Sequence, residues 1–345
     1  MKRFRSIDMA RAYAVLMIVL GHILRQGELR KWLYSFHVPL CLIVSGICFS
    51  KKRTFTEHIR SRFFRLMVPY YIFSVGSIVI YVLFAEKLEG METRAVEAQG
   101  ILSYFWGMLY GNVENDLMRW NTPLWYIPML FAMETLAYAV LPGKSAPRSD
   151  AVAVLASVVC ASALYYGVQD LNLPFGLETV VFLFPFFAIG RFLSSWVDKL
   201  ESGHKPILFA VGAALLLIGT LLKLQCPTVN YAEDRYNNYY MFIAVAVMLS
   251  LAVLCLSGAW SCRVIEIVGQ NTLPILLMHK FAVLFFDYVF PPTRALKRMW
   301  FLPGSLVNLA LTAALCLAVA ALIRRMAPWM LGLPRDARPK GHILR

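Results

Sequence analysis

Runs of about twenty apolar residues recur along this chain, from Ile7 to Ile323. A helix needs about 20 such residues to cross the hydrocarbon core of a bilayer. Of the 345 residues, 59% are hydrophobic and 16% are charged, whereas about a quarter of the residues in a soluble domain are charged. This composition excludes a soluble enzyme, a secreted disulfide scaffold and a disordered chain. The sequence therefore predicts an integral membrane protein.

The apolar runs define about ten candidate spans within a single domain, residues 1–345. They predict an all-α integral membrane protein, a bundle of about ten transmembrane helices around a central polar cavity. The expected spans are residues 7–24, 32–50, 67–85, 122–141, 151–168, 178–196, 206–224, 239–256, 270–290 and 300–323, followed by a basic tail at 324–345.

The distribution of positive charge predicts which side of the membrane each loop faces. With ten spans, both termini lie on one side, and the segments on that side hold twice as many Lys and Arg residues as those on the other. Because cytoplasmic loops are enriched in these residues, we expect both termini in the cytoplasm and the protein in the inner membrane. We thus expect the net charge of +14 to serve contact with anionic lipids rather than with nucleic acid. The basic loop with Arg294, Lys297 and Arg298 is an exception to this pattern.

Residues 100–112 form an apolar segment that is too short to span. It follows an acidic stretch that includes Glu86 and Glu97. We expect a re-entrant or interfacial helix on the outer side. If the segment did span, the topology after it would invert.

The first span carries three ionisable residues, Asp8, Arg11 and His22. Arg11 and His22 are eleven residues apart, so they lie within about 20° of one helix face and about 16 Å apart along the axis. Asp8 is one turn from Arg11, close enough to pair with it. The alternatives are that Arg11 snorkels to the interface and that His22 makes a packing hydrogen bond.

Polar residues in other predicted spans favour a functional interpretation of His22. Intramembrane ionisable residues tend to face a cavity or a partner. Such a cavity suits proton-linked chemistry or transport, since imidazole accepts a proton near neutral pH. The residues expected to line this cavity with His22 are His37, Ser45, Glu134, Asn271 and His279.

A basic pair precedes Pro69 in the segment that leads into the third span. Arg62 and Arg65 are spaced i, i+3, so on a helix they face one direction and can hold phosphate oxygens as two forks. A polyphosphate ligand or a lipid head group fits this arrangement. The alternative is an ordinary positively charged cytoplasmic loop.

Other motifs are missing from the sequence. It has no P-loop, no G-x-G-x-x-G fingerprint, no H-E-x-x-H and no G-x-S-x-G. The seven cysteines show neither zinc spacing nor a disulfide framework, so we expect no metal site.

Several stretches resemble the acyltransferase-3 family of integral membrane O-acetyltransferases, in particular its fucose 4-O-acetylase-like branch. Arg11 and His22 match its Arg–ten residues–His motif, and Arg62 and Arg65 match its Arg-x-x-Arg. Cys41-Leu42-Ile43 departs from the branch, which often has phenylalanines there. The matching stretches are RSIDMARAYAVLMIVLGH, SFHVPLCLIVSG, IRSRFFRLMVPY, LWYIPMLFAMETL and VGQNTLPILLMH.

This resemblance implies transfer of an acetyl group from acetyl-CoA to a hydroxyl of surface carbohydrate or a lipid-linked sugar. By the same resemblance His22 is the catalytic base, Arg11 is its essential partner with Asp8 beside it, and Arg62 and Arg65 bind the phosphates of coenzyme A. The aromatic residues near the outer end of the fourth span suit either an interfacial belt or a platform for a sugar; they are Trp106, Trp120, Trp125 and Tyr126.

A secondary transporter or flippase that uses the buried His and Glu side chains as a proton relay is the alternative. It shares the expected spans and intramembrane histidines. Against it, the sequence shows no two-fold hydropathy repeat and no matched pair of Gly/Pro-broken helices.

Overall fold

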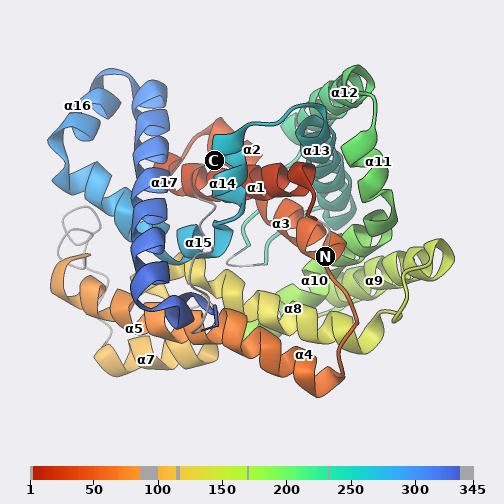
Figure 1. Ribbon diagram of the computed structural model, residues 1–345, viewed down its shortest axis with the longest axis horizontal. Helices are drawn as coiled ribbons and strands as arrows, with labels where there is room; N and C mark the ends of the chain where they lie inside the picture. The colour runs from red at the N-terminus through yellow and green to blue at the C-terminus, as the bar shows by residue number, and fades with distance from the viewer. Residues whose placement is uncertain (1–2, 86–99, 114–116, 169–170, 232–233, 335–345) are drawn as a thin grey trace. The chain divides into compact units, whose positions relative to one another are not determined.

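The computed structural model describes residues 3–85, 100–113, 117–168, 171–231 and 234–334 (Figure 1). These residues form helices joined by loops, and their only strand-like pairing is an isolated bridge between Asn230 and Arg235. Within the described residues, eight helices are long and apolar enough to cross a membrane. The predicted all-helical, multi-pass class is thus confirmed, while ten spans around a central cavity stay a prediction. The eight helices are Arg5–Leu24, Phe55–Phe84, Pro147–Gly167, Pro174–Ser202, Lys205–Leu224, Tyr239–Ala259, Thr272–Val289 and Phe301–Met326.

Two of the expected spans are broken helices in the structure. Residues 32–50 comprise the end of α2 (Glu28–Tyr34) and all of α3 (His37–Ile47), because the backbone leaves helical geometry at Phe36 (φ −152°, ψ −7°). Residues 122–141 begin in a 3-10 segment, Arg119–Trp125, with non-helical geometry at Asn121 (φ −159°, ψ 73°). Neither reaches the length of a regular span on its own.

The chain divides into two compact units. Unit 1 comprises residues 1–54, 133–171 and 178–272, and unit 2 comprises residues 55–132, 172–177 and 273–345. One of the points at which the chain passes from one unit to the other falls within helix α8 (Tyr126–Val140).

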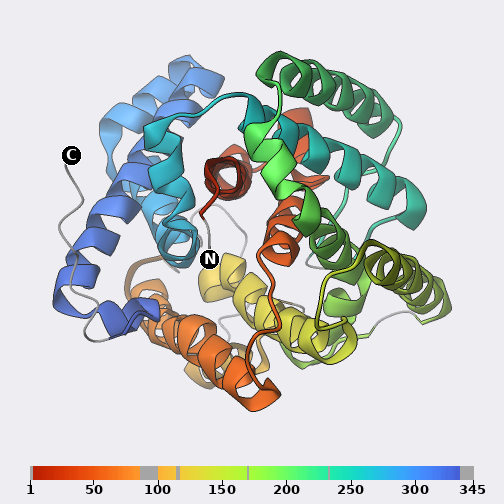
Figure 2. The same cartoon turned by 45° about the vertical axis from the view of Figure 1, so that its right-hand side comes forward.

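Unit 1 is built on α1 (Arg5–Leu24), which packs against α3, α13 and α14. Figure 2 looks nearly along the axis of α1, the dark red helix. At 20 residues, α1 is about 30 Å long, the thickness of the hydrocarbon core. Besides α2 and α3, unit 1 contains α9 (Pro147–Gly167), α10 (Leu177–Leu193), η6 (Ser194–Trp196), α11 (Val197–Ser202), α12 (Lys205–Leu224), α13 (Tyr239–Ala259) and α14 (Arg263–Gly269).

Helices α3 and α10 cross at two glycines. A Cβ on Gly46 would lie 2.1 Å from the carbonyl oxygen of Phe187, and one on Gly190 would lie 2.0 Å from that of Ile43. Small residues at membrane helix crossings allow such close backbone approach. This crossing fixes the direction of α3, and hence the position of Cys48 at its end.

Unit 2 contains a buried ion pair that accounts for part of the unexpected basic loop. Lys297 Nζ lies 2.9 Å from Asp287 Oδ1, and Asn308 donates to the same oxygen at 2.8 Å. Lys297 therefore serves to neutralise a buried carboxylate. The elements of unit 2 are α4 (Phe55–Arg62), η1 (Phe63–Met67), α5 (Val68–Ile80), η2 (Tyr81–Ala85), α7 (Ile101–Tyr110), η4 (Arg119–Trp125), η5 (Pro174–Gly176), α15 (Thr272–Leu284), η7 (Phe285–Val289), α16 (Pro291–Met299), α17 (Phe301–Met326) and η8 (Pro328–Leu331).

The short apolar segment 100–112 contains one helix, α7. Its ten residues are about 15 Å long, half the hydrocarbon core. Tyr104 and Met108 are buried, whereas Leu102 and Trp106 are exposed. The hydroxyl of Tyr70 donates to the Met108 carbonyl at 2.8 Å, which fixes the buried face of α7 to α5. The helix is thus shorter than a regular span, and its assignment as re-entrant or interfacial stays a prediction.

Candidate functional site

The first turns of α1 carry a buried carboxylate between two arginines. Asp8 Oδ2 lies 2.7 Å from Arg3 Nε, and Asp8 Oδ1 lies 3.6 Å from Arg11 Nη1. The Asp8 side chain is 8% exposed, whereas that of Arg11 is 38% exposed. A buried carboxylate is costly unless it is paired, and these two arginines supply that pairing. The pair expected from the i, i+3 spacing is present.

Arg11 also reaches a second element. Its Nη2 donates to the Cys48 sulfur at 3.0 Å, and Cys48 follows the last turn of α3. Glu134, which is buried on α8, acts electrostatically on the same thiol. Arg11, Asp8, Cys48 and Glu134 thus form one group, which we call the charged end of α1. It joins three segments that are distant in the sequence.

Helix α14 approaches the charged end closely. A Cβ on Gly269 would lie 1.8 Å from the carbonyl oxygen of Asp8. Asn271, two residues further on, therefore belongs near Asp8. Its Nδ2 donates to the Ile267 carbonyl at 2.6 Å, while its Oδ1 is buried with no hydrogen-bond partner among the described residues.

His22 lies at the opposite end of α1, about 21 Å from Asp8 along the axis. It is half-buried in the last turn of the helix. Beside it, a Cβ on Gly21 would lie 2.8 Å from the Tyr34 ring, and Arg30 Nε donates to the Gly21 carbonyl at 3.3 Å. Helix α2 is thereby fastened to the turn that carries His22. We call this region the aromatic end of α1.

His37 lies at the aromatic end and is held by packing. Its ring makes edge contacts with Tyr34 at 4.7 Å and Tyr231 at 5.6 Å between centroids. Its Nδ1 lies 2.8 Å from the Leu33 carbonyl. Because a carbonyl only accepts, Nδ1 carries a proton, and this N–H is used by the backbone. Burial raises the pKa of Tyr231 well above its usual value, so this neighbour stays a neutral phenol.

Two of the other residues expected to line the cavity bond to their own helices. Ser45 donates to the Cys41 carbonyl at 2.8 Å. His279 lies on α15 in unit 2 and its Nδ1 is 3.0 Å from the Leu276 carbonyl. His22, His37, Ser45, Glu134 and Asn271 belong to unit 1 and His279 belongs to unit 2. The structure therefore brings Glu134 and Asn271 to the charged end, but it places His37 with His22.

Arg62 and Arg65 lie in unit 2, where the helix changes its winding. Arg62 is the last residue of α4, and Arg65 is in a π-helical turn, Phe63–Met67, that precedes Pro69. Proline has no N–H to bond the carbonyl of Arg65, four residues earlier, which favours the wider turn. A Cβ on Gly332 would lie 2.7 Å from that carbonyl oxygen, so the segment after η8 packs on the Arg65 backbone. Arg62 is half-buried and Arg65 is exposed.

Some residues at the charged end could not be found from sequence patterns. Cys48 carries no motif, and its contact with Arg11 spans 37 positions. Glu201 accepts hydrogen bonds from the backbone and hydroxyl of Ser6 at 3.1 and 2.7 Å, so its carboxylate caps the start of α1. A negative charge at a helix N-terminus is favourable. In the sequence, the only indication that Glu201 lies near the start of α1 is its position in a loop on the side predicted for the N-terminus.

Eight long apolar helices with ionisable side chains buried between them define a multi-pass membrane protein. Within that class, the family model of an acyltransferase domain matches residues 4–325. The chain therefore belongs to the acyltransferase-3 family of membrane proteins, and its membership indicates acyltransferase activity. No curated protein and no solved structure matches the chain. Among the described residues, no group of three or more His, Cys, Asp or Glu side chains could hold a metal ion.

Proposed function

We propose that the protein transfers an acetyl group from acetyl-CoA to a hydroxyl of a surface carbohydrate or lipid-linked sugar, as in the fucose 4-O-acetylase-like branch of the family. The observation that carries this proposal is the division of α1 into a charged end with Arg11 and an aromatic end with His22. The family match supplies the acyltransferase class, and the two ends supply separate places for a donor and an acceptor.

His22 is the general base in this proposal. As the acceptor oxygen attacks the thioester carbonyl carbon, His22 takes the hydroxyl proton. The C–S bond then breaks, and His22 passes that proton to the sulfur, so that coenzyme A leaves as a thiol. A positioned general base contributes about 10²–10⁴-fold to such a step. The half-buried position of His22 in the last turn of α1 supports this role, because a base needs access to the acceptor.

Arg62 and Arg65 bind the phosphates of coenzyme A in this proposal. Guanidinium groups bind phosphate oxygens in pairs, and the exposed Arg65 is accessible to a soluble ligand. The donor enters from the cytoplasm in the predicted topology, with both termini on that side of the inner membrane. Arg11 lies about 16 Å from His22 along α1, a length comparable with the pantetheine arm.

The reaction also needs a group that stabilises the oxyanion, and Asn271 and His37 are the two candidates by residue type. The Nδ1–H of His37 is used by the Leu33 carbonyl, and Asn271 lies at the charged end, away from His22. We therefore propose that His37 has a packing role and that Asn271 is a polar contact for the donor.

The test is transfer of radiolabel from acetyl-CoA to membranes that contain the protein. We expect release of free coenzyme A together with labelled lipid or polysaccharide. Uptake of a substrate without its acetylation would favour the transporter interpretation instead. Mass spectrometry of surface glycans, with and without the protein, identifies the acetylated sugar.

A further inference from the structure

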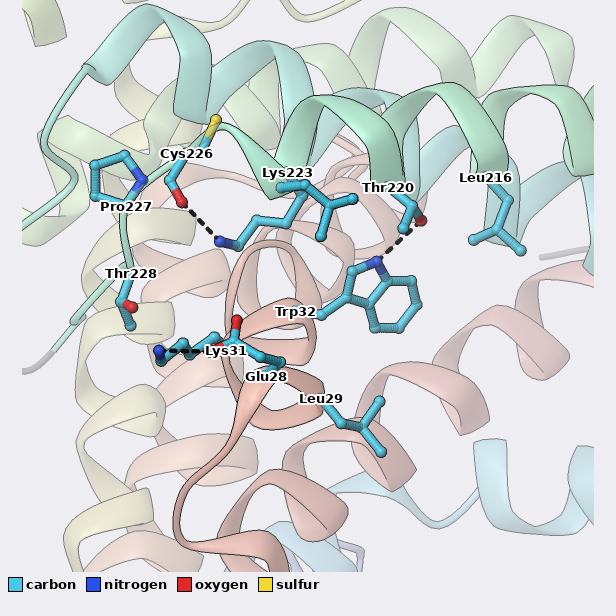
Figure 3. A pocket seen from close by; sticks show the side chains of 11 residues that line it. Glu28, Leu29, Lys31, Trp32, Leu216, Thr220, Lys223, Cys226, Pro227 and Thr228 are labelled. Carbon is cyan, nitrogen blue, oxygen red and sulfur yellow. Dashed lines mark hydrogen bonds and ion pairs between the residues drawn. The ribbon is translucent and has the colours of Figure 1, made fainter.

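A pocket of about 620 Å³ lies beside the aromatic end of α1, within unit 1 (Figure 3). Its volume is in the range of small-molecule sites. One wall comes from α2 and the other from the last turns of α12 and the loop that follows. The residues that line it are Glu28, Leu29, Lys31, Trp32, Leu216, Thr220, Lys223, Leu224, Cys226, Pro227 and Thr228.

The two walls are joined by a polar contact at the base of the pocket. The indole Nε1 of Trp32 donates to the Thr220 hydroxyl at 3.0 Å. This bond ties α2 to α12, and the ring of Trp32 packs edge-on against Phe36 at 4.9 Å between centroids. The packing of α2 against α12 therefore forms this pocket.

Two amines from opposite walls face the same end of the pocket. Lys223 is 7% exposed, and its Nζ donates to the Cys226 carbonyl at 3.0 Å. Lys31 Nζ lies 2.7 Å from Glu28 Oε1. Figure 3 shows both amines directed toward the Cys226–Thr228 loop, while Leu29 and Leu216 lie at the other end. An ammonium has three N–H donors, so each amine can bind an anion in addition to these contacts.

The α12 wall of the pocket continues onto an exposed helix face. Leu224 lines the pocket and is 73% exposed, and Leu221 and Leu217, one and two turns back, are also exposed. Helix α12 is a candidate span, so this face suits contact with lipid chains. The pocket lies where that candidate span ends, which is the depth of lipid head groups if α12 crosses the bilayer.

We propose that this pocket binds the phosphate of a lipid-carried acceptor, with Lys31 and Lys223 on the phosphate and the lipid chain along the exposed face of α12. This inference rests on the proposed function and assigns the acceptor to a lipid-linked sugar rather than to a soluble one. Paired amines suit a phosphate, and the apolar face suits its lipid.

The distance to the proposed base is compatible with this assignment. Glu28 is six residues after His22, so their Cα atoms lie within about 20 Å of each other. The bond from Arg30 to the Gly21 carbonyl holds α2 against the turn that carries His22. A sugar attached to the bound phosphate is therefore on the same side of unit 1 as the base.

The binding test uses farnesyl phosphate, with farnesol and inorganic phosphate as comparison ligands, and native mass spectrometry of the detergent-solubilised protein. We expect retention of farnesyl phosphate and not of the other two. Equal retention of farnesol would show that the amines do not contribute. Equal binding of inorganic phosphate would indicate a site for a soluble anion and overturn the proposal.

Substitutions in the two walls of the pocket should change the affinity for farnesyl phosphate in opposite directions. Lys223→Met should weaken the binding of farnesyl phosphate about tenfold or more, because it removes a charge-assisted contact. Glu28→Gln should strengthen binding about threefold, since it removes the carboxylate that competes for Lys31. A folding defect cannot produce that gain. The control is Lys205→Gln, which removes the same charge from the exposed start of α12 and should leave binding unchanged.

A transfer assay separates this inference from the proposed function. With wild-type membranes, we expect label from acetyl-CoA in the lipid extract, and Lys223→Met should lose most of it while still binding acetyl-CoA. Wild-type transfer that persists in Lys223→Met overturns the pocket assignment alone. Absence of any transfer by the wild type overturns the proposed function. Displacement of farnesyl phosphate by phosphatidylglycerol at equal affinity, with transfer unaffected, indicates an ordinary lipid site and also overturns the inference.

Discussion

The two ends of α1 are built from different kinds of contact. At the charged end, Asp8 and Arg11 are held by ionic contacts and by the Cys48 thiol. At the aromatic end, Gly21 packs against the ring of Tyr34, and the nearby His37 is enclosed by rings. Buried charges fix one arrangement because any other leaves a charge unpaired. The aromatic end leaves His22 half-buried, so its ring is accessible. In the proposed mechanism, α1 is therefore anchored at the charged end and carries the base at the aromatic end.

Replacement of His22 tests the aromatic end of α1 and has the largest expected effect on activity. His22→Ala should lower acetyl transfer at least about 100-fold, because it removes the proposed general base. The amount of protein inserted in the membrane should not change, because the His22 side chain is only half-buried and lies at the end of its helix. His204→Ala, at an exposed position before α12, is the matched control and should keep wild-type activity. Near wild-type turnover by His22→Ala would remove the base from the mechanism.

Gly269 tests whether the charged end acts as the anchor. A Cβ there would lie 1.8 Å from the Asp8 carbonyl, so Gly269→Ala must push α14 away from α1. Overpacking of this kind costs about 1–3 kcal/mol of unfolding free energy. We expect a fall of a few °C in the midpoint of thermal unfolding. Gly143→Ala is the control, because a Cβ at Gly143 meets no heavy atom within 4 Å. Equal midpoints for the two variants would show that this contact does not anchor α1.

The sequence predicted the local part of this arrangement and not the long-range part. The contact of Asp8 with Arg11 follows from one helical turn, and the distance from Arg11 to His22 follows from helix geometry. The thiol of Cys48 could not be predicted, since its position depends on the crossing of α3 and α10 at Gly46 and Gly190. Periodicity within one helix carries no information about which partner helix crosses it.

The aromatic residues show the same limit. From the sequence, Trp106 and Trp120 both suited an interfacial belt. In the structure, Trp106 is 56% exposed and Trp120 is fully buried. The difference comes from the 3-10 turn at Arg119–Trp125, where Asn121 leaves helical geometry. Such a turn overrides the apolar period from which the span was predicted.

A third test asks which arginines bind the phosphates of coenzyme A, those of the charged end of α1 or those of α4 and η1. Arg3 and Arg11 are engaged by Asp8, so we expect the phosphates of coenzyme A to depend on Arg62 and Arg65 instead. The double variant Arg62→Ala/Arg65→Ala should weaken acetyl-CoA binding about tenfold and leave acceptor binding unchanged. Lys144→Ala/Arg148→Ala, which removes two exposed charges, is the control. Equal losses of donor and acceptor binding would make the Arg62/Arg65 pair structural.

The smallest expected effect concerns the second histidine of the aromatic end. The Nδ1–H of His37 donates to the Leu33 carbonyl, and an asparagine amide can replace that donor at a similar distance from the backbone. His37→Asn should therefore cost about 1 kcal/mol of unfolding free energy, through lost ring packing against Tyr34 and Tyr231, and leave kcat unchanged. Thermal unfolding and steady-state rates measured on the same preparation separate the two effects. A loss of kcat as large as that of His22→Ala, without a shift in the unfolding midpoint, would mean that both histidines act on the proton, and that the aromatic end contains a relay rather than a single base.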